Sequence, residues 1–371
     1  MKKFVLLFCA CLVLSNLFAQ NIADHWFDAN EANIFIPANQ ERQIIPKNYR
    51  TLALELDELK SSLTNAPMEF TFAAKHHPTQ IILPMPNGDD VTFQVVESSV
   101  MSPVLAAKYP NIKSYAGYGV DNKLLQVRFE IAAKGFRAMI GSPDGVIFID
   151  PYLEGNNNNY LSYYKKDRLP NATEAAILSA AHADHNPLES FNATKPLEDN
   201  DGGPNNPFQD KGPSTTPTPE GPTTTGNPVE LRLYRLALAT SGEFSATQGG
   251  TVDGVMAELV YATSRLNFIF EKETGVRFQL VDNNDELVFI DAATDPFEGN
   301  EINNTTDING TIIAFGTFYQ SVTTINSVVG VENYDVGHLF KTFPCLLGGI
   351  GIGGVSGGNV CIDETKARGI S

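Results

Sequence analysis

The sequence predicts an α+β multidomain protein, in which a β-rich region precedes an α/β region with a mainly parallel sheet. Alternating apolar and polar residues, which are typical of half-buried strands, are frequent in residues 20–195. Proline, glycine and threonine are concentrated in residues 196–228. In residues 229–371, strand patterns alternate with helix patterns, and this order favours a parallel sheet.

The composition supports folded domains and argues against one class of partner. Hydrophobic residues make up 42% of the 371 residues, and 10% are aromatic, which excludes global disorder. The net charge is −17, and no basic run compensates for it. Because an acidic surface repels phosphate, we expect no nucleic acid partner.

Residues 1–19 have the features of a secretory signal peptide. Lys2 and Lys3 precede an apolar run over residues 4–14, and a cleavage site after Ala19 fits the pattern. A membrane anchor is the alternative, but the apolar run is too short to span a bilayer. We therefore expect a secreted or periplasmic protein that has no membrane contact after signal cleavage.

A β-rich domain with some helix is predicted for residues 20–195. Residues 89–101 alternate as a strand does, and residues 123–152 read as three strands with turns at 134–135 and 143–145. A helix is predicted over residues 51–67, because four leucines recur there at helical spacing. The region that follows, residues 196–228, is too rich in proline to build a core, and we expect an exposed linker that is open to proteolysis.

The α/β region, residues 229–371, begins with an alternating strand. Its clearest helix has an apolar stripe and ends at Gly275, a residue type favoured just after a helix. Residues 286–290 are expected to extend or pair with the strand that follows this helix. The predicted elements, in order, are a strand over 229–240, a helix over 252–274, a strand over 276–282, a helix over 312–329 and a strand over 333–343.

Several common catalytic motifs are absent from the sequence. It contains no H-E-x-x-H zinc helix and no C-x-x-C pair. The glycine cluster over residues 347–358 follows the third strand without a helix signal, and it lacks the Lys-Ser/Thr pair of a phosphate loop. A glycine-rich strand or loop that lets another backbone approach is therefore expected.

Cysteine and histidine offer few ligands. After signal cleavage, only Cys345 and Cys361 remain, and they could close one loop, or Cys361 could pair outside this chain. His182 and His185 would share a face of a helix and could hold a metal, although a solvated helix end beside the linker is the simpler interpretation. His338 is expected to be a packed or hydrogen-bonded strand histidine.

Long stretches of the chain resemble one protein family. "YRLALATSGEFSATQGGTVDGVMAELVYATSRLNFIFEKETGVRFQLVD", "NYDVGHLFKTF" and "GGNVCIDETKARGIS" resemble the first part of the catalytic domain of bacterial reprolysin-like zinc metalloproteases of the metzincin clan. "LPMPNGDDVTFQVVESSVMSPVLAAKYPNIKSYAGYGVDN" and "GFRAMIGSPDGVIFIDPY" are similar to the propeptide region of such proteins. Residues 20–195 would then be the prodomain.

The resemblance implies a zinc-dependent endopeptidase that cleaves protein or peptide substrates with a zinc-activated water. In that family, the strand that contains "KARG" leads into a helix with three zinc-binding histidines and a glutamate base. No such helix is present in this sequence. We therefore assign no catalytic residue and no zinc ligand here, and we expect zinc in the complete enzyme but none bound by this chain.

The resemblance also implies a substrate site. In metzincins an edge strand pairs its backbone with the extended substrate, and residues 348–355 are the best match by their order along the chain. Gly349, Ile350, Gly351 and Ile352 are thus candidate substrate contacts, and an ordinary flexible loop is the alternative.

Latency of the enzyme would need a group other than cysteine, because the mature chain has no cysteine before Cys345. His182, Asp184 and His185 are candidates, and steric occlusion is the alternative. The complete expectation is a precursor fragment of a secreted zinc metalloendopeptidase that ends before the zinc-binding helix and is inactive alone. The alternative is a non-catalytic secreted binding or inhibitory protein derived from the same family.

Overall fold

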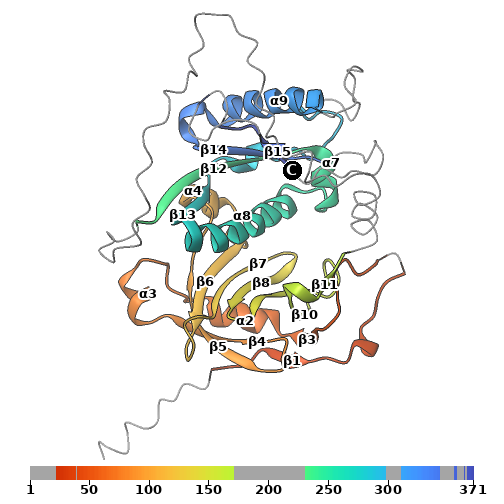
Figure 1. Cartoon of the computed structure of the whole chain (residues 1–371), viewed down its shortest axis with the longest axis vertical. Helices are drawn as coiled ribbons and strands as arrows, with labels where there is room; N and C mark the ends of the chain where they lie inside the picture. The colour runs from red at the N-terminus through yellow and green to blue at the C-terminus, as the bar shows by residue number, and fades with distance from the viewer. Residues whose placement is uncertain are drawn as a thin grey trace, which may run out of the picture.

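The computed structural model describes residues 22–38, 40–170, 230–297, 311–342, 355–356, 363 and 366–371, without the side chains of residues 311–318 and 355–356. It contains two large sheets, one in the N-terminal region (residues 22–170) and one in the C-terminal region (residues 230–371). In Figure 1 the C-terminal region lies above the N-terminal region. Both regions contain helices and strands, so the α+β class is confirmed. Among the helices described, none is long and apolar enough to cross a bilayer.

The N-terminal region is built on a nine-stranded antiparallel sheet with the order β1-β3-β10-β9-β8-β7-β6-β5-β4. The strands are β1 (Trp26–Asp28), β3 (Arg50–Leu54), β4 (Thr79–Pro84), β5 (Asp90–Glu97), β6 (Lys113–Gly119), β7 (Gln126–Ala132), β8 (Gly135–Ser142), β9 (Gly145–Pro151) and β10 (Asn159–Tyr164). The smaller elements are β2 (Ile45–Pro46), β11 (Arg168–Leu169), α2 (Leu56–Leu63), α3 (Phe72–His76), α4 (Pro103–Lys108), η1 (Glu31–Asn33) and η2 (Lys165–Asp167).

The hairpins of this sheet confirm the predicted strands and turns. Gly135 and Gly145 have φ angles of +97° and +119°, which L side chains rarely adopt, and each begins a strand after a tight turn. The core on one face of the sheet is aromatic. Trp26 packs edge-on against Phe136 and Tyr160, with ring centroids 5.2 and 5.4 Å away.

The helix predicted over residues 51–67 is wrong at its first part. Residues 50–54 form β3, which pairs with β1 and β10, and only Leu56–Leu63 are helical. Leu52 and Leu54 alternate with partly exposed residues and face the core as strand residues do, whereas Leu59 and Leu63 reach the same core from the helix. The leucines that suggested a single helix are Leu52, Leu56, Leu59 and Leu63. All four share one core, but Leu52 reaches it from β3 and the other three from α2.

The C-terminal region contains a five-stranded sheet with the order β13-β12-β14-β16-β15, in which only β15 runs antiparallel to its neighbour. The mainly parallel sheet predicted from the sequence is therefore present. The elements are β12 (Arg232–Thr240), α7 (Gly242–Thr247), α8 (Val252–Thr274), β13 (Val276–Leu280), η3 (Asn284–Leu287), α9 (Thr311–Val329), η4 (Val331–Asn333), β14 (Val336–Phe340), β15 (Val355–Ser356) and β16 (Gly369–Ile370).

Helices α8 and α9 cover opposite faces of this sheet, as Figure 1 shows. Leu236 and Leu238 of β12 pack in the core with α8, whereas Ala237 and Ala239, which point the other way, pack in the core with α9. Helix α8 begins where the Thr251 side chain accepts a hydrogen bond from the amide of Gly254, and it ends at Gly275, whose φ is +66°. The helix predicted over residues 252–274 is confirmed.

The prediction of a strand at residues 286–290 is wrong. Residues 284–287 form the short helix η3, and only Val288 makes an isolated bridge, to Thr240. The reason is the side chain of Asn284, which accepts a hydrogen bond from the amide of Leu238 at 2.8 Å and donates one to its carbonyl at 3.2 Å. This amide group therefore takes the place of a neighbouring strand beside β12.

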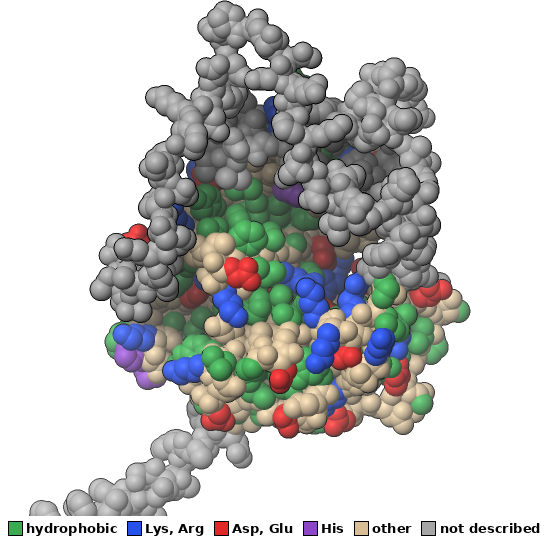
Figure 2. Space-filling model, viewed as in Figure 1, with side chains coloured by type: hydrophobic (Ala, Val, Ile, Leu, Met, Phe, Trp, Pro, Cys, Tyr) green, Lys and Arg blue, Asp and Glu red, His purple; other side chains and the backbone are tan. Residues whose placement is uncertain are grey.

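The two regions pack directly against each other. Helix α8 contacts strands β7 and β8 of the N-terminal sheet, and residues 100–102 pair with the end of β13. Figure 2 shows acidic and basic side chains along the boundary between the two regions.

Candidate functional site

The candidate site lies at the β15 edge of the C-terminal sheet. Val355 and Ser356 pair antiparallel with Ile370 and Gly369 of β16, and within the described residues β15 has no second neighbour. An edge strand offers backbone N–H and C=O groups that can bind an extended peptide by strand addition. Val355 is the last residue of the stretch 348–355 that sequence matching favoured for this role.

A buried lysine positions the turn that leads into β16. The Lys366 ammonium is 2.9 Å from an Asp363 carboxylate oxygen, donates to the carbonyl of Val331 and lies 4.5 Å from the centre of the Tyr334 ring. On the same turn, the Ser321 hydroxyl of α9 donates to the carbonyl of residue 367 at 2.8 Å. The "KARG" stretch is thus tied to α9 and η4, and it places β16 beside β14.

His338 occupies the centre of β14 and is packed, as the sequence predicted. Its Nε2 is 2.8 Å from the Ser371 hydroxyl, and its ring makes an edge contact with Phe340 at 5.2 Å. Gly369 lies across from it, and a Cβ there would come within 2.3 Å of His338 Nδ1. Burial lowers the pKa of His338 from 6.5 to about 4, so the imidazole is neutral at neutral pH.

This burial predicts a loss of stability in acid. Below pH 6.5 the unfolded chain protonates His338, while the folded protein resists protonation until about pH 4, so stability falls as the pH drops through this window. On acidification through this window, His338 should lower the free energy of unfolding by about 3 kcal/mol. We expect the His338→Gln variant to lack this decrease. Urea unfolding at several pH values measures this, with exposed His77→Gln as the control. Equal acid sensitivity in the His338→Gln variant and the unaltered protein would contradict it.

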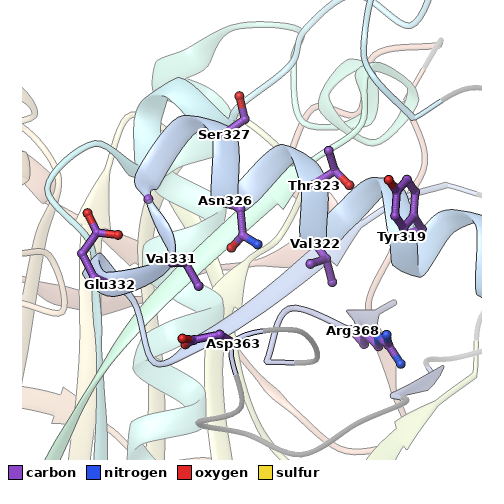
Figure 3. A pocket seen from close by; sticks show the side chains of 10 residues that line it. Tyr319, Val322, Thr323, Asn326, Ser327, Val331, Glu332, Asp363 and Arg368 are labelled. Atoms are coloured by element: carbon purple, nitrogen blue, oxygen red, sulfur yellow. The ribbon is translucent and has the colours of Figure 1, made fainter.

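A hollow of about 820 Å³ opens beside α9, on the face of the sheet away from α8 (Figure 3). Asp363 and Arg368 border it from the turn before β16, and Glu332 borders it from η4. The rest of its lining is Tyr319, Val322, Thr323, Asn326, Ser327, Gly330 and Val331. No nucleophile–base pair and no cluster of metal ligands stands among these described lining residues.

The described residues offer no set of side chains that fits a zinc ion. Within the described parts of the chain, no group of three His, Cys, Asp or Glu side chains could hold a metal. The one histidine described in the C-terminal region, His338, engages Ser371 instead. The other described histidines, His25, His76 and His77, lie in the N-terminal region, where His25 Nε2 is 2.9 Å from the Ser62 hydroxyl.

Most of the residues singled out from the sequence lie outside the described residues. This applies to the four candidate substrate contacts, the two cysteines and the three candidate latency residues: Gly349, Ile350, Gly351, Ile352, Cys345, Cys361, His182, Asp184 and His185. Sequence reasoning in turn missed Lys366 and Asn284. A lysine or asparagine in a polar turn gives no periodic signal, so only the structure shows that both are buried and bonded.

The C-terminal region has the architecture of an α/β layer whose parallel sheet is closed by one antiparallel edge strand, with a helix on each face. Residues 231–370 match the family model described as Metallo-peptidase family M12B, Reprolysin-like. The resemblance to reprolysin-like metalloproteases is thus confirmed for these residues, and the M12B family depends on zinc in general. A search of curated proteins found no match.

Proposed function

We propose that this sequence is the precursor portion of a secreted zinc metalloendopeptidase. In this proposal, residues 20–195 are the prodomain, residues 196–228 hold the activation cleavage site, and residues 229–371 contribute the sheet that binds substrate. The zinc-binding helix would come from residues outside this sequence. The match of residues 231–370 to the reprolysin-like family is the observation that carries the proposal.

The sheet order supports the proposed role of β15. Peptide binding by strand addition needs an accessible edge, and β15 forms one edge while β13 forms the other. Residues 100–102 of the N-terminal region already pair with β13, so β15 is the edge left for a substrate among the described strands. Contacts of the N-terminal region with α8 and β13 lie away from β15, and His182, Asp184 and His185 remain a prediction for latency.

The 371-residue chain is predicted to bind no zinc tightly and to hydrolyse no peptide, because it contains no H-E-x-x-H motif. Zinc content after dialysis and cleavage of a fluorogenic protein substrate, with and without added Zn²⁺, check this. A longer chain that includes the H-E-x-x-H helix should bind one zinc and be inhibited by a chelator. One zinc bound tightly by the 371-residue chain would contradict the proposal.

A second candidate function follows from the same missing motif. The chain would be a secreted, non-catalytic protein that binds or inhibits a relative. The nucleotide sequence after the Ser371 codon separates the two candidates. An open frame that encodes H-E-x-x-H supports the peptidase precursor, and a stop codon supports the non-catalytic protein.

A further inference from the structure

The first observation concerns the sheet edge at β13. The Leu280 amide donates to the Val100 carbonyl at 2.8 Å, and the Ser102 amide donates to the Leu280 carbonyl at 3.0 Å. Met101 and Leu280 form a parallel bridge. The N-terminal region therefore adds a short strand segment to the C-terminal sheet, which is the geometry by which sheet edges bind partners.

The second observation is a shared apolar core. Val100, Met101, Leu105 and Ile112 of the N-terminal region are buried in one cluster with α8 and β12. Separation of the two regions would expose these side chains, together with the α8 residues that they cover. Because exposure of apolar surface to water is unfavourable, this core favours association of the two regions.

The third observation is a set of charge pairs that cross the boundary in both directions. Arg277 of β13 donates two hydrogen bonds to the Glu69 carboxylate, at 2.8 and 3.0 Å. Arg128 of β7 is 2.6 Å from Glu271 of α8, and the same carboxylate also contacts Arg277 at 2.5 Å. These four side chains form one chain of alternating charge, in which two members come from each region.

Two further pairs extend the contact. Arg137 of β8 is 2.8 Å from Glu258 of α8, and Lys108 is 2.9 Å from Asp285 of η3. The N-terminal region thus places positively charged side chains beside Glu258, Glu271 and Asp285. It also places the Glu69 carboxylate beside Arg277. Removal of one partner from a largely buried pair leaves an uncompensated charge, so such pairs discriminate strongly between matched and mismatched surfaces.

We propose that the N-terminal region remains bound to the C-terminal region as a noncovalent complex after the chain between them is cut, and that these charge pairs determine its recognition of α8. The partner of this surface is therefore the C-terminal region, whether from the same copy or from a second copy. Binding between the regions needs neither zinc nor peptidase activity. Its test can fail or succeed independently of the proposed function.

The experiment uses the full chain with a site for a sequence-specific protease inserted within residues 196–228. After cleavage, size-exclusion chromatography over a dilution series measures whether the two parts elute together. We expect them to elute as one complex at micromolar concentrations. Two separate peaks at such concentrations would overturn the proposal.

Charge exchange then tests recognition. Arg137→Glu alone and Glu258→Arg alone should each raise the dissociation constant about 30-fold or more, and the double variant should restore most of the affinity. An exchange of the exposed pair Asp57 and Lys60, which lies within the N-terminal region, is the matched control and should change nothing. If a reversed variant does not fold before cleavage, Arg137→Met replaces it and should still weaken binding. Unchanged affinity in the folded single variants, or no recovery in the double variant, would overturn the role of the charges.

Discussion

The unaltered protein is expected to lose much of its stability as the pH rises from 4.5 to 8, and replacing Glu130 by glutamine should abolish this loss. Glu130 lies on β7 at the boundary with α8 and is only 5% exposed. Its burial raises the pKa of the carboxyl from 4.5 to about 8, although the nearby charges of Arg128, Arg265 and Arg137 act in the opposite direction. The folded protein therefore keeps this carboxyl protonated at neutral pH.

Between pH 4.5 and about pH 8, the unfolded chain releases the Glu130 proton while the folded protein retains it, so stability falls as the pH rises. The loss over this window is about 5 kcal/mol. Glutamine has nearly the same shape and cannot ionise, so the Glu130→Gln variant should be more stable than the unaltered protein at pH 8.

Other ionisable side chains lie near Glu130, so the experiment needs a control. Glu258, Tyr261, Arg265 and Glu271 face this boundary from α8, and Asp150 faces it from β9. Urea unfolding from pH 5 to pH 9 should therefore compare Glu130→Gln with Glu41→Gln, which changes an exposed glutamate of the N-terminal region. If the free energy of unfolding of the Glu130→Gln and Glu41→Gln variants changes with pH in the same way, Glu130 is not the source of the stability loss. If the two regions separate before they unfold, the two parts of the cleaved chain should also bind each other more weakly at pH 8 than at pH 6.

Replacing Asn284 by alanine is expected to destabilise the C-terminal region by about 4 kcal/mol. The Asn284 side chain is fully buried and satisfies both the amide and the carbonyl of Leu238. Leu238 lies on β12 past the last residue of β12 that pairs with β13, so no strand can replace these two bonds on that side. Alanine leaves both backbone groups buried without this partner.

The neighbouring asparagine gives the matched control. Asn283 makes a single side-chain hydrogen bond, to the carbonyl of Val328 at 3.0 Å, and Asn283→Ala should cost about 1 kcal/mol. Thermal and urea unfolding of both variants measure the difference. Asn284→Asp keeps the acceptor for the Leu238 amide but loses the donor, so it should also be strongly destabilised. A similar small cost for Asn283→Ala and Asn284→Ala would refute the bridging role of Asn284.

The local elements were largely predictable because their signals are local. The apolar stripe and Gly275 predicted α8, and the two glycine turns predicted the hairpins between β7, β8 and β9. The errors occurred where residues of different elements reach the same core. The leucines of β3 and α2 appear as one helical stripe, and Asn284 interrupts a stretch whose apolar residues alone favour a strand.

The candidate site was less accessible to sequence reasoning. Strand order, the antiparallel direction of β15 and the anchor at Lys366 depend on contacts between residues far apart in the chain. The hydrogen bond between Lys366 and Val331, for example, spans 35 positions. No spacing within one element specifies such a contact.

The sequence by itself showed the resemblance to reprolysin-like metallopeptidases, most of the strands and helices and the absence of an H-E-x-x-H motif, because periodicity, turn residues and motifs are properties of short stretches. Only the tertiary structure decided that α8 is shared between the two regions. The pair of Glu69 and Arg277 spans 208 positions, and that of Arg128 and Glu271 spans 143. Charged residues on a predicted strand or helix would otherwise be assigned to solvent, and they become buried pairs only when the two regions meet.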